Sequence, residues 1–421
     1  MDKLVTQGGR RLEGTVEISG AKNSALPILA ATVLSKEKSV IRNVPQVADV
    51  FTMVKILKSL GARVQHTGGT VTVDPSGVRN PVLTYKLVST MRGSVCFLGP
   101  FLARFHSAQI SFPGGCVIGP RPIDLHLKGV KALGAEVELE HGYVMAKTRG
   151  LRGARIYLGG AFGSSVLGTG NVMMAATMAR GRTVIVNAAC EPEVVDLGNF
   201  LRKMGARISG LGSPSIEIEG VKKLSGANYS IIPDRIEAGT YMIASAITRG
   251  DVTIKNFDLS MLGAMLDKMR EAGVVITEKK GHVRVRRRKV LKSVSVTTLP
   301  YPGYPTDLQA QMMALMCTVP GISVITEKIY PERFMHVSEL NRMGARIMLE
   351  GPSAIVNGTK KLSGAPVMAS DLRASAGLVV AGLVAQGSTE VSRIYHLDRG
   401  YENLVSKLQR LGAKISREKD Q

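Results

Sequence analysis

Cys116 lies in a stretch whose composition suits a reactive thiol. Three glycines surround it between Pro113 and Pro122, which predicts a loop rather than a core segment. Arg121 follows five residues later, and a nearby guanidinium favours the reactive thiolate. Cys116 is therefore a candidate catalytic group. The alternative is an inert loop thiol, which is the commoner case for a free cysteine.

Asp307 is a second candidate, because it opens a predicted helix within Tyr304–Gln309. A carboxylate that lies among arginines could serve as a general base. Alternatively, Asp307 only caps its helix and complements the helix dipole.

Basic side chains recur at the starts of the predicted helices. Such starts expose free N–H groups and the positive end of the helix dipole, so they bind phosphate and carboxylate. Arginine adds a planar fork for bidentate contact with these anions. Any one cation could be an ordinary surface charge, but the set indicates anionic substrates. Its members are Lys22, Arg92, Arg121, Arg235, Arg333, Arg373 and Arg399.

The elements that must position these groups recur six times along the chain. An apolar helical pattern ends in Gly-Ala, or once in Gly-Val, at intervals of 68 to 73 residues. Such a period marks an internal repeat. Each glycine suits the left-handed position that ends a helix. The six are Gly61, Gly134, Gly205, Gly273, Gly344 and Gly412.

Each unit is predicted to contain a helix, a strand, a second helix and a strand pair. The first helix is rich in small residues and begins at a polar position, as at Lys22 and Asp371. The second helix is amphipathic, and in the first unit a hairpin around Gly68-Gly69 follows it. These elements predict an α/β fold.

Six units predict two domains of three. Because the first polar helix start falls at Lys22, we expect residues 1–21 to join residues 233–421 in one domain, with the N-terminal strand completing it. Residues 22–232 would form the other domain, which carries the cysteine loop.

The chain has 55 Lys and Arg against 33 Asp and Glu, a formal charge of +22 that favours anionic partners. The most basic run, Val283–Lys289, is predicted to be a solvated, alternating edge strand that leads into a turn. Nucleic-acid binding is the alternative, but no aromatic residues alternate with these basic residues.

Four cysteines without CxxC spacing predict neither a zinc site nor a disulfide framework. Two stretches without charge, 156–179 and 308–326, contain too many polar residues and glycines to be predicted as membrane spans. The first residues do not resemble a signal peptide, so we expect a cytoplasmic protein.

Several motifs together resemble those of the enolpyruvyl transferases, over essentially the whole chain. The resemblance implies a two-domain inside-out α/β barrel of six units, three per domain, with the active site in the interdomain cleft. The motifs are Ser19–Pro27, Pro113–Arg121 with Asp124 and His126, Pro233–Glu237, Pro305–Gln311, Arg333–Val337, Ser370–Ser375 and Tyr395–Glu402.

The resemblance also implies an activity, which is transfer of enolpyruvate from phosphoenolpyruvate to the 3′-hydroxyl of UDP-N-acetylglucosamine by addition and elimination, with release of phosphate. This is the committing step of peptidoglycan synthesis, and hence of cell-wall biogenesis, cell shape and division. Asp307 matches the family's base. Cys116 matches the acid that protonates C3 and can hold a covalent adduct. No metal or organic cofactor is implied.

The binding residues implied by the resemblance fall into three groups. The phosphoenolpyruvate contacts are Lys22, Arg121 and Arg399. The UDP-sugar contacts are Asn23, Arg92, Arg121, Pro122, Ile123, Asp124, Leu125 and Ile329. The rest of the active-site cluster is Arg333, Asp371 and Arg373.

One segment departs from the family pattern. Residues 159–169 form a turn longer by about three residues than the family's compact turn, and Leu167 stands where the family has glycine. Ser164, Ser165 and Val166 remain candidate nucleotide contacts.

Two related alternatives remain. The 3-phosphoshikimate branch of the family shares the fold and the donor but lacks the cysteine loop. An inactive paralogue is the other alternative, against which the intact set of Lys22, Cys116, Asp307 and Arg399 argues. The sequence does not predict the oligomeric state.

Overall fold

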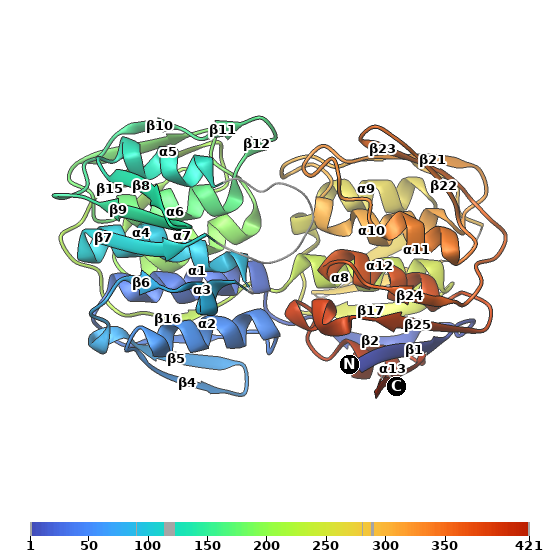
Figure 1. The fold of residues 1–421 in the computed structure, drawn as a ribbon. Helices are drawn as coiled ribbons and strands as arrows, with labels where there is room; N and C mark the ends of the chain where they lie inside the picture. Colours follow the sequence, from blue (N-terminus) through green and yellow to red (C-terminus); the bar gives the residue numbers. More distant parts are fainter. Residues whose placement is uncertain (1, 90, 113–122, 280, 288–289, 420–421) are drawn as a thin grey trace. The chain divides into compact units, whose positions relative to one another are not determined.

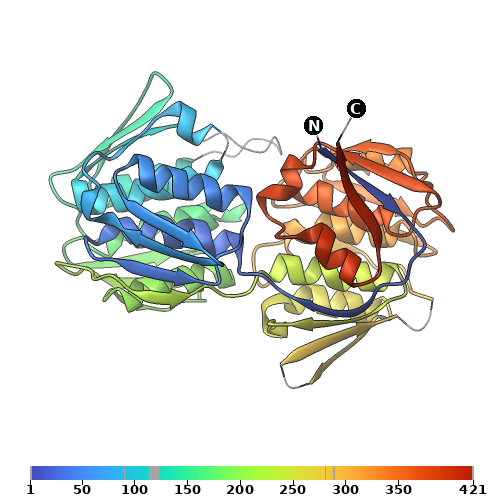
Figure 2. The same ribbon diagram turned by 90° about the horizontal axis from the view of Figure 1, so that it is seen from below.

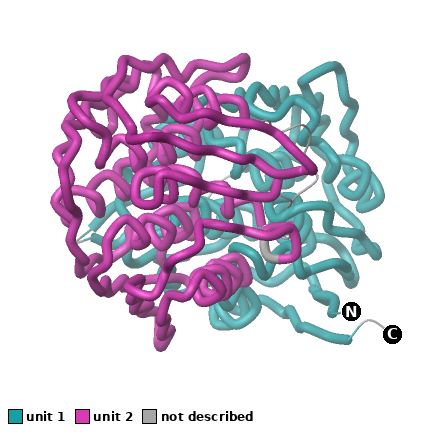
Figure 3. The backbone as a smooth tube through the Cα atoms, turned by 60° about the vertical axis from the view of Figure 1, so that its left-hand side comes forward, with its two compact units in different colours: residues 1–19, 117–119, 233–421 teal, residues 20–116, 120–232 magenta. Residues whose placement is uncertain are grey.

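The computed structural model describes residues 2–89, 91–112, 123–279, 281–287 and 290–419. The chain divides into two compact units (Figure 3). Unit 1 contains residues 2–19 together with residues from Pro233 onward, and unit 2 contains the described residues from Gly20 to Ile232. The chain therefore passes between the units twice, after Ser19 and after Ile232.

Buried helices form the centre of each unit (Figure 1). In unit 1 there are three such helices among the described residues, and every residue in them is buried. Their side chains must therefore be apolar on all sides, or find hydrogen-bond partners within the unit. None of the described helices is long and apolar enough to cross a lipid bilayer. The buried helices are α1 (Lys22–Ala31), α4 (Leu98–Phe105) and α6 (Val166–Ala176) in unit 2, and α8 (Arg235–Ile247), α10 (Gln309–Met316) and α12 (Leu372–Gly382) in unit 1.

A second set of helices buries one face and ends at the repeated glycines. All six glycines have φ between 86° and 106°, which confirms the predicted left-handed helix endings. These helices are α2 (Ala48–Ser59), α5 (Asp124–Ala132), α7 (Pro192–Lys203), α9 (Gly263–Glu271), α11 (His336–Arg342) and α13 (Leu404–Arg410).

Four-stranded sheets cover the buried helices (Figure 1). Within the described residues each unit has three such sheets, and each sheet contains one parallel pair. In unit 2 the strand orders are β16 (Asn228–Ser230), β3 (Ser39–Arg42), β5 (Thr70–Asp74), β4 (Arg63–Thr67); β6 (Val82–Leu83), β7 (Ser107–Ser111), β9 (Tyr143–Lys147), β8 (Glu136–Glu140); and β10 (Arg155–Tyr157), β13 (Arg182–Val186), β15 (Ser215–Glu219), β14 (Arg207–Ser209).

Unit 1 repeats this arrangement, so the predicted α/β architecture of six units is confirmed. Its strand orders are β2 (Glu13–Glu17), β17 (Asp251–Lys255), β19 (His282–Arg286), β18 (Val275–Lys279); β20 (Val296–Thr297), β21 (Ile322–Thr326), β23 (Ser353–Asn357), β22 (Arg346–Glu350); and β24 (Pro366–Met368), β25 (Ser388–Ser392), β1 (Asp2–Gln7), β26 (Lys414–Lys419).

In each unit, strands that lie far apart in the sequence pair with one another. In unit 1, β1 lies between β25 and β26, where Leu4 pairs with Val391 on one side and with Arg417 on the other. Figure 2 shows β1 (dark blue) beside β26 (dark red). In unit 2, β16 pairs in parallel with β3, and Ala21 N–H donates to the carbonyl of Ile232 at 2.8 Å.

The basic run differs from its prediction as an edge strand. Strand β19 is paired on both sides, by β18 and β17, and the side chains of Val283 and Val285 are fully buried. Arg284 donates two hydrogen bonds to Asp251, each of 2.7 Å. The alternating pattern predicted the strand correctly but could not show its second neighbour, which comes from the chain before it.

A buried ion pair anchors the first crossing of the chain in unit 1. Lys407 Nζ lies 2.6 Å from Glu237 Oε1 and 2.7 Å from Ser19 Oγ, and Ser19 N–H donates to Glu237 Oε2 at 2.8 Å. Burial raises the pKa of Glu237 to about 7, although Lys407 acts in the opposite direction. The carboxylate therefore depends on the lysine to remain charged.

We predict that Lys407→Met lowers the free energy of unfolding by about 3–5 kcal/mol at alkaline pH, because it leaves the Glu237 carboxylate buried without its cation. The loss should shrink as the pH falls, since a raised pKa in the folded state favours folding once the group is protonated. Urea denaturation would measure both effects. The double variant Lys407→Met/Glu237→Met should recover much of the lost stability; an equal loss in both variants would contradict the electrostatic cause.

Candidate active site

Asp307 lies between two buried guanidinium groups in unit 1. Its Oδ1 accepts a hydrogen bond from Arg333 Nη1 and its Oδ2 accepts one from Arg373 Nη2, both at 2.9 Å. The arginine side chains are only 8% and 2% exposed, whereas that of Asp307 is 26% exposed. Two cationic donors favour the ionised carboxylate. Asp307 is thus the accessible end of a charged cluster.

Asp371 completes this cluster from the start of α12. Its Oδ1 accepts the backbone N–H groups of Arg373 at 2.8 Å and Ala374 at 3.2 Å, and lies 3.8 Å from Arg333 Nη2. Burial alone would lower the pKa of Arg333, but Asp307 and Asp371 outweigh it and raise that pKa. The negative charges of the two carboxylates therefore compensate the positive charges of the two guanidinium groups.

Glu327 is connected to the Asp307 cluster through Thr306, and it was not predicted from the sequence. This fully buried carboxylate accepts the N–H of Ile329 at 2.8 Å and the hydroxyl of Thr306 at 2.8 Å. Thr306 Oγ1 in turn accepts from Arg333 Nη1 at 3.0 Å. The only sequence signal for Glu327 is an acidic residue directly after the apolar strand β21. Its contacts link Ile329, a predicted UDP-sugar contact, to the turn that carries Asp307.

Arg399 ends the 3₁₀-helix η6 (Ile394–Arg399) and is half-buried. Burial lowers the pKa of His396, and Arg399 lowers it further, whereas Asp371 opposes the change. Arg399, His396 and Asp371 therefore share one electrostatic environment in unit 1.

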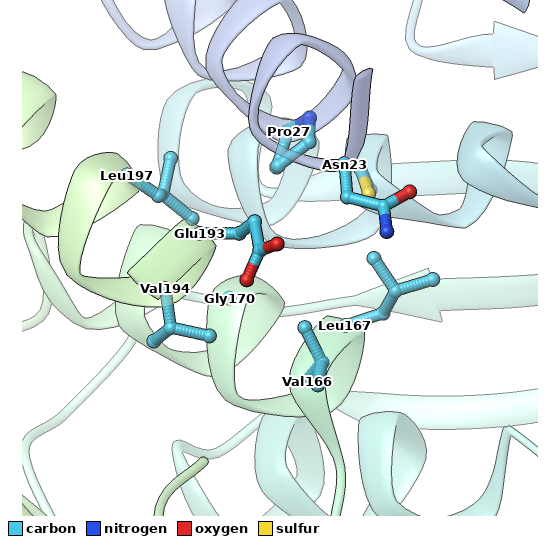
Figure 4. A pocket seen from close by; sticks show the side chains of 9 residues that line it. Asn23, Pro27, Val166, Leu167, Gly170, Glu193, Val194 and Leu197 are labelled. Atoms are coloured by element: carbon cyan, nitrogen blue, oxygen red, sulfur yellow. The ribbon is translucent and has the colours of Figure 1, made fainter. Parts of the chain in front are cut away.

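Lys22 and Asn23 form the start of α1 in unit 2. Lys22 Nζ lies 3.3 Å from Asp49 Oδ2 on α2, and both side chains are largely buried, at 12% and 6% exposed. Asn23 lines a pocket between α1, α6 and α7 (Figure 4). Its amide and the carboxylate of Glu193 both point into this pocket, and Leu167 forms part of its wall (Figure 4). Asp49 and Glu193 were not predicted from the sequence.

A buried amide holds His126 in one state. Asn171 Oδ1 accepts the N–H of Gly99 at 2.9 Å, so its Nδ2 donates, to the carbonyl of Val95 and to His126 Nδ1, both at 2.8 Å. His126 therefore carries its proton on Nε2. Burial and the nearby Arg92 lower the pKa of His126 to about 3. The imidazole of His126 is therefore neutral and lies near Arg92, a predicted UDP-sugar contact.

The other predicted nucleotide contacts lie together at the starts of α5 and α6. Ile123 is buried and Asp124 is exposed. Leu125 lies close to Gly160, since a Cβ atom added to this glycine would be only 3.2 Å from Leu125 Cδ1. The unusual turn forms a short hairpin of β11 (Gly159–Gly160) and β12 (Gly163–Ser164). Val166 then opens α6 and also lines the pocket.

Side-chain caps use part of the free N–H groups at the starts of three buried helices. Asp234 accepts two at the start of α8, Asp371 accepts two at the start of α12, and Ser165 accepts one at the start of α6. The expectation of free N–H groups is therefore only partly met at these starts. By contrast, α1 has no side-chain cap at Ala21.

Three predicted site residues, Cys116, Arg121 and Pro122, lie outside the described residues. Within the part of the chain that is described, no group of three or more His, Cys, Asp or Glu could hold a metal ion.

Comparisons with known proteins agree over nearly the full length. The family model of EPSP synthase (3-phosphoshikimate 1-carboxyvinyltransferase) matches residues 6–418. The UDP-N-acetylglucosamine 1-carboxyvinyltransferase of Geotalea uraniireducens is 55% identical over 417 residues, covering 99% of each chain. The protein of the same name from Geobacter metallireducens is 54% identical over 420 residues, covering 100% of each.

A solved structure shares the fold. The enolpyruvyl transferase NikO from Streptomyces tendae superposes with a TM-score of 0.89 at 25% sequence identity, covering 100% of this chain and 99% of that one.

The state of His126 can be measured directly. With its pKa lowered to about 3, the imidazole should show constant ring ¹⁵N shifts typical of an Nε2–H tautomer across roughly pH 5 to 8. Two-dimensional NMR of histidine-labelled protein would record them. A titration midpoint near the usual histidine value would contradict the buried, neutral assignment.

Proposed function

Since the chain belongs to the EPSP synthase family of enolpyruvyl transferases, we propose that it transfers the enolpyruvyl group of phosphoenolpyruvate to the 3′-hydroxyl of UDP-N-acetylglucosamine and releases phosphate. The observation that carries the acceptor's identity is the 54–55% identity, over nearly full length, to relatives that bear the name of this activity. We place the protein in the cytoplasm, at the committing step of peptidoglycan synthesis.

In the addition step, Asp307 accepts the proton of the sugar hydroxyl as its oxygen attacks C2 of phosphoenolpyruvate. The thiol of Cys116 gives its proton to C3, so the double bond becomes a tetrahedral ketal that still carries phosphate. In the elimination step, C3 returns a proton to the Cys116 thiolate and the C2–O bond to phosphate breaks, which restores the double bond; the proton on Asp307 leaves with the phosphate. These steps require only proton transfers and a leaving phosphate, so we propose no cofactor.

The Asp307 cluster supports this role through its exposure and charge. Asp307 is the most exposed member, at 26%, so a substrate hydroxyl can reach it. Asp307 holds Arg333 and Arg373 in place, and preorganised cations stabilise charge that develops on phosphate and carboxylate. We assign Arg399 to the same anionic groups.

We assign substrate binding in unit 2 to the residues grouped at the starts of its helices. Lys22, with Arg121, would contact phosphoenolpyruvate. Asn23 and Val166 line one small pocket, so these two proposed UDP-sugar contacts lie close together. The UDP-sugar contacts would be Asn23, Arg92, Arg121, Pro122, Ile123, Asp124, Leu125, Ser164, Ser165 and Val166, with Ile329 from unit 1.

Shikimate 3-phosphate is the alternative acceptor, because the matching family model carries the name of that activity. The names of the full-length relatives and the Cys116 loop favour the UDP-sugar. Nucleic-acid binding by the basic run has less support, since Arg284 is already paired with Asp251.

The proposed function predicts phosphate release that requires both phosphoenolpyruvate and UDP-N-acetylglucosamine. Purified protein would be assayed with each substrate alone, with both, and with shikimate 3-phosphate in place of the UDP-sugar. Release only with the first pair is expected. Release with shikimate 3-phosphate instead would transfer the assignment to the other branch of the family.

A second prediction concerns Asp307. Asp307→Asn should lower kcat by about 100- to 10,000-fold, because the amide cannot accept the hydroxyl proton. KM for either substrate should change by less than about threefold. Asp251→Asn, which breaks the surface pair with Arg284, is the matched control and should keep wild-type kinetics. If KM rose as much as kcat fell, Asp307 would be a binding or structural group instead.

A further inference from the structure

Tyr401 contacts one side chain from each buried helix of unit 1. Its side chain is almost fully buried, as the residue is only 4% exposed. The hydroxyl oxygen lies 2.8 Å from Thr240 Oγ1 on α8 and 3.1 Å from Gln311 Nε2 on α10. The guanidinium of Arg373 on α12 lies over the ring, 5.4 Å from its centre. One side chain therefore touches all three helices.

The hydrogen bonds around this hydroxyl have a defined direction. The Thr240 hydroxyl donates to the carbonyl of Ile236 at 2.8 Å, so towards Tyr401 it can only accept. The Tyr401 hydroxyl must then donate to Thr240. Gln311 Nε2 lies 3.1 Å from the oxygens of both Tyr401 and Thr240, so these two acceptors share one of its N–H groups. The hydroxyl is used both as a donor and as an acceptor.

Gln311 extends this arrangement to the candidate base. Its Nε2 also donates to the backbone carbonyl of Asp307 at 3.1 Å. Because that carbonyl can only accept, the amide nitrogen must face it, and the amide orientation is fixed. Gln311 is fully buried, so water cannot replace these bonds without opening the core. The Tyr401 hydroxyl, together with that of Thr240, therefore orients the Gln311 amide, which in turn contacts the backbone of Asp307.

The ring of Tyr401 acts on the partner of Asp307. Arg373 is 2% exposed and donates from Nη2 to Asp307 Oδ2 at 2.9 Å. Its Nη1 is buried and has no hydrogen-bond partner among the described residues. The Tyr401 ring lies against the guanidinium and therefore helps to fix its orientation, a contact that cation–π attraction favours.

We propose that Tyr401 is a positioning residue for the transfer reaction, holding Asp307 through Gln311 and Arg373 through its ring, so that the carboxylate and guanidinium keep their relative geometry. The catalytic part of this inference rests on the proposed function. Its geometric part, the separation of Asp307 and Arg373, does not.

Tyr401→Phe tests the role of the hydroxyl, because the variant keeps the ring and its packing. We expect kcat for phosphate release to fall by roughly 10- to 100-fold, as small misplacements of reacting groups do, while KM for both substrates stays nearly unchanged. Thr240→Val should give a similar loss, and Thr240→Ser, which keeps the hydroxyl, should restore activity. The double variant Tyr401→Phe/Thr240→Val should be no worse than either single variant.

Tyr241→Phe is the matched control. Tyr241 lies on α8, is 1% exposed, and its hydroxyl has no hydrogen-bond partner among the described residues. This variant removes a buried tyrosine hydroxyl from the same unit and should keep wild-type kinetics. An equal loss of kcat in both variants would show a general packing effect and would overturn the proposal.

Crystal structures of the wild-type protein and of Tyr401→Phe supply a readout without turnover. We expect the Arg373–Asp307 hydrogen bond to lengthen or break in the variant; unchanged geometry together with wild-type kcat would overturn the inference. Failure of the proposed function has a different signature, which is a wild-type protein that releases no phosphate from the two substrates. In that case the two structures alone decide the positioning role.

Discussion

The burial of three helices in each unit, complete in unit 1 and nearly complete in unit 2, is the constraint on which the rest depends. A polar or charged group on such a helix costs free energy unless it finds a partner, and in unit 1 the charged groups find partners mainly at the helix starts. Asp234 and Asp371 satisfy two starts by capping them. At the third, Asp307 turns its carboxylate towards Arg333 and Arg373 instead. The Asp307 cluster therefore also meets a requirement of the fold.

Much of the fold could be predicted because its signals are local. A glycine that ends a helix and an amphipathic face are visible within a few turns of sequence, and both recur six times. The short parallel strands could not be predicted in this way. Strand β6 has only two residues, too few to show alternation, and β16 pairs with β3 across nearly the whole of unit 2. Similarly, β19 pairs with β17 as well as with β18, and the pairing with β17 depends on how the chain is connected rather than on a local pattern.

The candidate site divides along the same line. Asp307, Arg333 and Arg373 were identified from short motifs, and the structure brings them together. Glu327 and Asn171 were not, and Gln311 was included only as the end of the Pro305–Gln311 motif, because a buried polar residue shows its role only through its partners. Gln311 acts on Tyr401, 90 residues later in the chain, and Asn171 acts on His126, 45 residues earlier. Charge and spacing can suggest which groups react, but not which groups hold them.

The pairing of β1 with β25 and β26 also has a consequence for synthesis on the ribosome. Strand β1 emerges long before its partners, which begin at Ser388 and Lys414. At typical translation rates that interval is about 20 to 80 s. Unit 2 has all its strands by Ser230 and can fold meanwhile. For that time the nascent chain carries a strand with two unpaired edges, the kind of segment that chaperones shield.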